Sequence, residues 1–361
     1  MKRTILSAVA IIMAFNAFDA KACTGITLHT KAGATIPART IEWAGNDINS
    51  RYVIVPRGYT QRSYTPDGGL NGMEFTSVYG YVGLAVDQDA FVVDGMNEAG
   101  LTAGLFYFPG YGGYVGYNPD RARKTLSDFQ LVSWILGNFD NIDAVKKAIR
   151  DIDVVAIDPR SSTVHWRITE PGGRQVVLEI IDGKLNFHEN TLGVFTNSPD
   201  FRWHLTNLNN YINLATGPIA QKNYGDYSLS AFGGGSGMLG LPGDMTPPSR
   251  FVRAAFFQMT APKLDSSEET VAQAFHILNS FDIPVGIQFA EGQEIPDIPS
   301  ATQWTVATDI SGRKIYYRTM YNSNIRCIDL AGIDFGKVHF QSAPLDEVKS
   351  QSFEPVRIGR R

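Results

Sequence analysis

Apolar and polar residues alternate in several short segments of the chain, and this pattern predicts β-strands. In residues 23–30, Ile26 and Leu28 fall on one face and polar side chains on the other, which is the period of a half-buried strand. The other candidates are Arg51–Pro56, Ala90–Gly95, Thr163–Thr169, Gln175–Ile181, Trp304–Asp309 and Lys314–Tyr321. Glycine-containing turns join the last four into two pairs, which favours β-hairpins.

Helical spacing appears between these groups of strands. Leu126, Phe129, Val132 and Leu136 recur at that spacing, and residues 141–150 form a second candidate helix. Ser266 and Glu269 make a capping box that opens a third helix. Antiparallel strands with helices between them predict an α+β fold, and packed sheets flanked by helix layers satisfy this order of elements.

The first 22 residues do not fit this pattern of strands and helices. Lys2 and Arg3 precede an apolar run from Ile5 to Phe18, and Ala20-Lys21-Ala22 follows before Cys23. This order is typical of a secretory signal peptide. We therefore expect residues 1–22 to be removed, residues 23–361 to form a single domain, and the protein to be exported, either to a periplasm or into the medium.

Charge and cysteine content narrow the function classes. The net charge is −4 and there is no run of Lys or Arg, which argues against nucleic-acid binding. No apolar stretch after residue 22 has the roughly 20 residues of a membrane span. Cys23 and Cys327 are the two cysteines of the chain. Export permits a disulfide between them, but we expect Cys327 to be a small buried residue of a strand.

Cleavage after Ala22 gives Cys23 both a thiol and a free α-amine. A thiolate is a strong nucleophile, and an adjacent amine of near-neutral pKa can serve as its base. The alternative is a lipoprotein, in which an N-terminal Cys is only an anchor. Ala20 instead of Leu at the third position before the cleavage site argues against that alternative, as does the strand that begins at Cys23.

A catalytic thiol needs a nearby cation that lowers its pKa. Arg39 follows the first strand closely enough to face Cys23 from an antiparallel return strand. Glu42 can orient the amine or the arginine. The competing interpretation is a surface pair between Arg39 and Glu42.

Five spaced strings resemble the choloylglycine hydrolase family, which includes penicillin V acylases and bile salt hydrolases. They cover essentially all of the chain after residue 22. The strings are Cys23-Thr24-Gly25, Arg39-Thr40-Ile41-Glu42, Asp94 to Leu101, Thr196-Asn197-Ser198-Pro199 with Trp203 to Leu208, and Gly240 to Asp244 with Ser249-Arg250-Phe251.

The resemblance implies a four-layer αββα sandwich of two packed antiparallel sheets and an N-terminal-nucleophile hydrolase that cleaves linear amide C–N bonds. It makes Cys23 the nucleophile and Arg39 the cation beside it. Glu42 stands where most members have Asp. The resemblance makes Asn197 the side-chain donor and Tyr107 the backbone donor of the oxyanion hole, and Arg250 a second active-site arginine. It implies no cofactor or metal, a small-molecule amide substrate and a homotetramer.

These strings resemble those of two substrate classes. Tyr107 and Thr196 to Pro199 look nearer to penicillin V acylases, and Phe108-Pro109-Gly110-Tyr111 is common in bile salt hydrolases. Our first interpretation is a penicillin V acylase-like amidase, with a conjugated bile salt hydrolase as the alternative and a non-enzymatic lipoprotein as a remote one. We expect Trp43, Phe106 and Tyr107 to line the acyl pocket. His204 and His276 lack zinc-ligand spacing and are expected to be hydrogen-bonded core residues.

Overall fold

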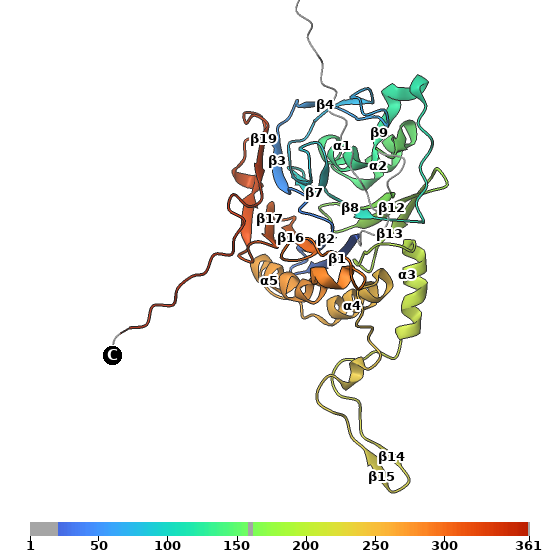
Figure 1. Ribbon diagram of the computed structural model, residues 1–361, viewed down its shortest axis with the longest axis vertical. Coiled ribbons are helices and arrows are strands. Elements are labelled where there is room, and N and C mark those ends of the chain that lie inside the picture. The colour runs from blue at the N-terminus through green and yellow to red at the C-terminus, as the bar shows by residue number, and fades with distance from the viewer. Residues whose placement is uncertain (1–20, 158–161, 360–361) are drawn as a thin grey trace, which may run out of the picture.

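Two antiparallel sheets lie face to face at the centre of the molecule, and helices cover both outer sides (Figure 1). The computed structural model describes residues 21–157 and 162–359, so most of the predicted signal peptide lies outside the described residues. The arrangement confirms the predicted α+β class and the four-layer αββα order.

The smaller sheet carries Cys23. It has the strand order β1-β2-β16-β17-β18. Its strands are β1 (Lys21–His29), β2 (Thr35–Trp43), β16 (Thr302–Asp309), β17 (Lys314–Thr319) and β18 (Arg326–Asp329). The predicted hairpin of β16 and β17 is confirmed. Nearly every residue of β2 is buried, because one face of the strand meets the helix layer and the other meets the second sheet.

The larger sheet has eight strands in the order β13-β12-β11-β8-β7-β6-β3-β19. They are β3 (Arg51–Val55), β6 (Tyr81–Ala85), β7 (Val92–Asn97), β8 (Thr102–Tyr107), β11 (Val164–Thr169), β12 (Gln175–Ile181), β13 (Lys184–Glu189) and β19 (Gln341–Pro344). The predicted hairpin of β11 and β12 is confirmed.

Helices cover the sheets in two groups (Figure 1). The helix α1 (Leu131–Asn138) packs on the eight-stranded sheet, with α2 (Ile142–Ala148) beside it. On the five-stranded sheet lie α4 (Pro247–Thr260) and α5 (Ser267–Leu278), and α3 (Phe201–Leu208) packs on α4. The predicted capping box at the start of α5 is present. No helix of the described residues is long and apolar enough to cross a bilayer.

Three short strand pairs lie outside the two sheets. They are β4 (Thr60–Arg62) with β5 (Glu74–Thr76), β9 (Thr125–Ser127) with β10 (Asp153–Val155), and β14 (Lys222–Tyr224) with β15 (Tyr227–Leu229). The last pair forms the tip of an arm, residues 215–239, that projects from the body of the molecule (Figure 1). Two backbone hydrogen bonds close the base of this arm, from Ala215 N–H to Gly237 O and from Gly237 N–H to Gly217 O.

Three sequence-based expectations were wrong. The helix expected from Leu126 begins only at Leu131, because Thr125–Ser127 pairs as a strand with β10. Cys327 is exposed and not buried, since β18 is an edge strand of its sheet. His276 also points to solvent, on the outer face of α5. Both cysteines are free thiols in the structure.

Candidate active site

The hairpin of β1 and β2 brings Cys23 and Arg39 together. Gly25 lies opposite Arg39 and Cys23 lies opposite Ile41, so Arg39 reaches Cys23 diagonally from the neighbouring strand. The Nη2 atom of Arg39 donates to Sγ of Cys23 over 2.9 Å, and both side chains are buried. The predicted meeting of this cation with the thiol is present, and a surface pair of Arg39 and Glu42 is not.

Arg39 is fixed from the side of the eight-stranded sheet. Its Nη1 atom donates to Val93 O over 3.2 Å and to Leu105 O over 2.5 Å. The buried carboxylate of Asp94 lies 3.6 Å from the same atom, and the guanidinium carbon stands 4.0 Å above the ring of Phe106. The guanidinium therefore has a fixed orientation in a site that water does not reach.

Burial and charge act in opposite directions on the thiol. Burial raises the pKa of Cys23, and the charge of Glu42 adds to this effect. Arg39, a hydrogen bond from the backbone N–H of Tyr107 and Arg250 lower the pKa. Burial outweighs the arginines, so the pKa of Cys23 lies above its ordinary value in the full-length chain. The two arginines and the amide donor are the groups that stabilise the thiolate once it forms.

Asn197 lies at the open edge of β1. Its Oδ1 atom accepts from Cys23 N–H over 2.8 Å, and its Nδ2 atom donates to Tyr107 O over 2.8 Å. Oδ1 also accepts from Nη2 of Arg250. Because both of its partners are donors, this end of the amide is the oxygen. Two residues earlier, Phe195 exchanges backbone hydrogen bonds with Gly25. This bridge attaches the loop of Asn197 to the strand of Cys23.

Arg250 reaches the site from the first turns of α4. It donates from Nη1 to Cys23 O over 2.6 Å and to Thr24 Oγ1 over 2.8 Å, and from Nη2 to Asn197 Oδ1 over 2.8 Å. The side chain is fully buried, and burial lowers its pKa. It joins the strand of Cys23 to the loop of Asn197.

Glu42 lies on the opposite face of the hairpin from Arg39, across from Ala22. The carboxylate is buried, and neither oxygen has a hydrogen-bond partner of good geometry among the described residues. Burial raises its pKa to about 7, although Arg250, the Thr40 hydroxyl and Arg39 favour the charged form. A buried carboxylate without a hydrogen-bond partner is costly, so a further donor or cation beside Glu42 would stabilise its charged form.

The three expected pocket residues occupy different places. Trp43 ends β2 and is partly exposed, with its indole N–H on Asn46 Oδ1 at 2.7 Å. Tyr107 ends β8 and is also partly exposed. Phe106 has no exposed surface, because its ring lies between Arg39 and Phe195. The structure therefore gives Phe106 a supporting position behind Arg39 and no surface for a substrate.

Sequence reasoning missed several neighbours of this site. Asp94 and Thr24 both stand within the family strings, so their motifs were a usable signal. His165, whose Nε2 atom lies 3.1 Å from Thr196 O, and Glu179, which lies 3.2 Å from the same ring, gave no signal, because no motif contains them. No group of three or more His, Cys, Asp or Glu side chains in the described part of the chain has metal-binding geometry.

Comparisons with known proteins agree with this geometry. The model of the linear amide C–N hydrolases, choloylglycine hydrolase family, matches residues 23–341. The bile salt hydrolase/transferase of Clostridium perfringens is 32% identical over 316 residues, which are 85% of this chain and 92% of the relative. The penicillin V acylase of Pectobacterium atrosepticum is 25% identical over 380 residues, covering 98% and 92%.

A solved structure matches as well. A variant of the conjugated bile acid hydrolase from Clostridium perfringens superposes with a TM-score of 0.80 at 29% identity, over 93% of this chain and all of that one. The family match spans most of the chain and begins at Cys23. The chain therefore belongs to the choloylglycine hydrolase family and is a hydrolase of linear amide C–N bonds.

Proposed function

We propose that the mature chain hydrolyses the amide bond of conjugated bile salts through the thiol of Cys23. The observation that carries the chemistry is the 2.9 Å contact between the buried thiol and Arg39, with Asn197 bonded to the nitrogen of the same residue. The substrate class is supported by the relatives. The bile salt hydrolase of Clostridium perfringens is 32% identical, against 25% for the penicillin V acylase of Pectobacterium atrosepticum. This similarity favours our alternative over the penicillin V acylase-like interpretation.

The reaction begins with proton transfer from the thiol of Cys23 to its own α-amine. The thiolate attacks the amide carbon, and the resulting oxyanion accepts from the backbone N–H of Tyr107 and from the Asn197 amide. The ammonium of Cys23 returns the proton to the departing amine as the C–N bond breaks. Water, deprotonated by the same amine, then attacks the thioester, which releases the acid and restores the thiol.

This mechanism requires that Cys23 be the first residue. In the full-length chain its nitrogen is an amide that donates to Asn197, and an amide nitrogen is not a base. Export and removal of residues 1–22 therefore belong to the proposal, and the start of the family match at Cys23 supports them. Once it has taken the thiol proton, the freed amine also places a positive charge beside the buried carboxylate of Glu42.

Parallel assays with glycocholate and penicillin V on the exported protein test the substrate. We expect the kcat/KM for glycocholate to exceed that for penicillin V; the reverse order restores the penicillin V interpretation. Cys23→Ser should abolish most turnover of both compounds, and unchanged activity would contradict the mechanism. Intact-mass spectrometry gives the N-terminus. A chain that begins at Cys23 supports the proposal, and added lipid on Cys23 supports the lipoprotein alternative.

We also propose that the mature chain assembles into a homotetramer. The arm, residues 215–239, supports contact with other copies, because Tyr224 and Tyr227 at its tip are 71% and 70% exposed and Phe232 is fully exposed. Exposed apolar patches of this kind mark association surfaces. Light scattering gives the mass directly. A monomeric mass, or a tetramer that persists after the arm is deleted, would contradict the role of the arm.

A further inference from the structure

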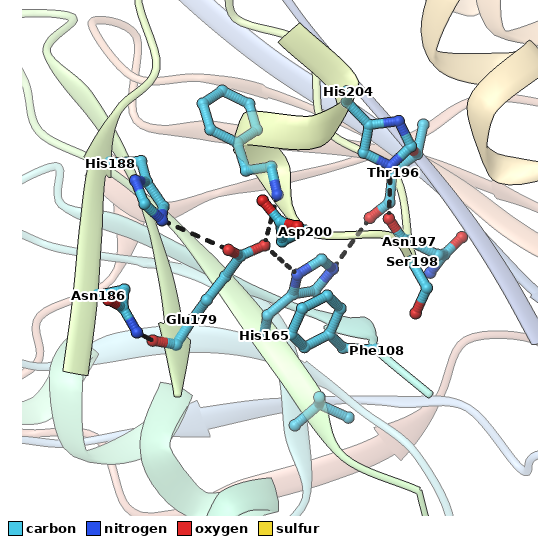
Figure 2. A network of polar contacts seen from close by, with 12 residues as sticks. Phe108, His165, Glu179, Asn186, His188, Thr196, Asn197, Ser198, Asp200 and His204 are labelled. Atoms are coloured by element: carbon cyan, nitrogen blue, oxygen red, sulfur yellow. Dashed lines mark hydrogen bonds and ion pairs between the residues drawn. The ribbon is translucent and has the colours of Figure 1, made fainter. Parts of the chain in front are cut away.

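Two histidine rings face two consecutive carbonyl groups of the loop that carries Asn197. The Nε2 atom of His165 lies 3.1 Å from Thr196 O, and the Nε2 atom of His204 lies 2.8 Å from Asn197 O. Figure 2 shows the two rings on either side of this short stretch of backbone. The loop has no strand ladder of its own apart from the bridge at Phe195, so these contacts fix the peptide from which the Asn197 side chain projects.

His165 is itself held rigidly. It stands on β11, and the rings of Phe108 and Phe195 lie with centroids 4.2 Å from its ring. Its Nδ1 atom lies 3.2 Å from Glu179 Oε1. The same oxygen accepts from Phe201 N–H over 2.9 Å, which identifies it as an acceptor. Burial lowers the pKa of His165, whereas Glu179 and the hydrogen bond to Thr196 O favour its charged form. Both partners are acceptors, so the ring donates to both of them when it carries two protons. These two contacts and the two covered faces give the ring one orientation, and the Thr196 carbonyl is held with it.

Glu179 connects the two histidines. The contacts with His165, His188 and Phe201 N–H hold the pKa of this buried carboxyl down at about 2, against the effect of burial. Phe201 is the first residue of α3, the helix that carries His204 three residues later. One carboxylate therefore orients the ring of His165 and anchors the helix of His204 (Figure 2).

His204 acts as a neutral donor. Burial lowers its pKa to about 4, and its single ring proton belongs on Nε2, which faces a carbonyl oxygen. Its Nδ1 atom has no hydrogen-bond partner among the described residues. The ring lies flat on Phe251 at 4.7 Å with an angle of 13°. This packing can be preserved when the donor is removed.

We propose that His165 and His204, connected by Glu179, are positioning residues that aim the Asn197 amide at the substrate oxyanion. The inference rests on the proposed function, in which Asn197 supplies that donor. The other donor, Tyr107 N–H, lies at the end of a regular strand and needs no such support. None of the three residues contacts Cys23, so they act through the peptide of Asn197.

His204→Phe is the first test. It keeps the stacking on Phe251 and leaves Asn197 O without its donor. We expect kcat for glycocholate to fall roughly 10²-fold, the cost of a misplaced catalytic group, with KM within about twofold of wild type by the same argument. The rate of Cys23 alkylation by iodoacetamide should not change. His204→Gln, which can place an amide N–H near the lost Nε2, should restore most of kcat.

The matched control is His188→Gln. His188 contacts the other oxygen of Glu179 at 3.4 Å and does not contact Thr196 or Asn197, so we expect kcat near that of wild type. His165→Phe tests the second ring and should also lower kcat. Should either phenylalanine variant fail to fold, its glutamine counterpart keeps the comparison available.

A double-variant cycle separates positioning from general stability. In an Asn197→Ala background the side chain to be aimed is gone, so His204→Phe should have almost no further effect on kcat. The proposal would be overturned if the fold decreases in kcat of the two single variants multiplied in the double variant. A rise in KM with unchanged kcat would also overturn it.

A readout without substrate separates this inference from the proposed function. Hydrogen–deuterium exchange in the peptide spanning residues 193–200 should accelerate in His204→Phe and not in His188→Gln. Unchanged exchange overturns the positioning role even if the enzyme prefers another amide. A wild-type enzyme without activity on glycocholate or penicillin V would instead contradict the proposed substrates.

Discussion

The two faces of the β1–β2 hairpin serve the two reactive groups of Cys23 in different ways. On the face toward the eight-stranded sheet, Arg39 already contacts both the thiol and Asp94 in the full-length chain. On the face toward α4, the carboxylate of Glu42 lies opposite Ala22 with no close partner. Folding alone therefore completes the surroundings of the thiol, whereas under the proposed mechanism the surroundings of the amine are completed by the removal of residues 1–22.

The largest expected effect comes from breaking the thiol face at Arg39. An adjacent arginine lowers the pKa of an acidic group by roughly 1–3 units, so Arg39→Met should raise the pKa of Cys23 and lower kcat/KM about 10²–10³-fold. The pH dependence of alkylation by iodoacetamide measures this directly. We expect its midpoint to move to higher pH, because the thiol loses the cation that favours its charged form.

Arg39→Lys is the control for this substitution. It keeps a positive charge but cannot reproduce the bonds to Val93 O and Leu105 O together with the contact to Sγ. An intermediate alkylation midpoint is expected. A midpoint in Arg39→Met equal to that of wild type would show that Arg39 does not set the thiol pKa.

A smaller effect is expected from replacing Gly25, whose missing side chain leaves space for Arg167 and Phe106 on the same face of the hairpin. A Cβ atom there would lie 2.8 Å from Nη1 of Arg167 and 3.1 Å from the ring of Phe106, and Phe106 supports Arg39. Overpacking of this kind costs about 1–3 kcal/mol. Gly25→Ala should therefore lower the melting temperature and reduce kcat roughly 10- to 100-fold, through displacement of Arg39.

Gly172→Ala is the matched control for Gly25→Ala. Apart from Gly172 itself and its two chain neighbours, no residue lies within 4 Å of the position of a Cβ there, and Gly172 stands in the turn between β11 and β12. Its melting temperature and activity should match the wild type. Equal behaviour of the two variants would contradict the steric argument for Gly25.

The thiol face could be predicted from the sequence further than the amine face could. Alternation identified the strand of Cys23, and the short distance along the chain to Arg39 indicated an antiparallel return strand. Both inferences rest on local pairing. The family strings then pointed to Asn197 and Arg250, and the structure places both in contact with Cys23.

The contacts of the Asn197 loop could not be predicted from the sequence, because they depend on which strands are neighbours in the sheet. His165 reaches the loop of Asn197 because β11 pairs with β8, and this neighbourhood is not encoded in any local pattern. His204 was expected to be a hydrogen-bonded core residue, and it is one. Its partner could not be foreseen, since it depends on the path of the loop before α3. Cys327 was misjudged because strand alternation does not reveal which strand lies at a sheet edge.

The smallest expected effect on activity concerns Glu42, which lies on the amine face of the hairpin. In the full-length chain its pKa of about 7 lies above the ordinary value of 4.5. Between these two pH values the folded chain holds a proton that the unfolded chain has released. The free energy of unfolding should therefore fall as pH rises through this window, by about 3 kcal/mol in total.

Glu42→Gln should remove this slope from the full-length chain, as measured by denaturant unfolding at pH 5 and pH 7. After the proposed removal of residues 1–22, the α-amine of Cys23 lies beside the carboxylate and lowers its pKa when protonated, so the part of the slope that Glu42 contributes should be absent from the mature chain. Asp128, whose pKa burial also raises to about 7, should contribute the same slope in both chains. Glu42→Gln should then lower kcat only about tenfold, because it loses one charge-assisted hydrogen bond. An identical pH slope in the full-length and mature chains would mean that cleavage does not complete the amine face.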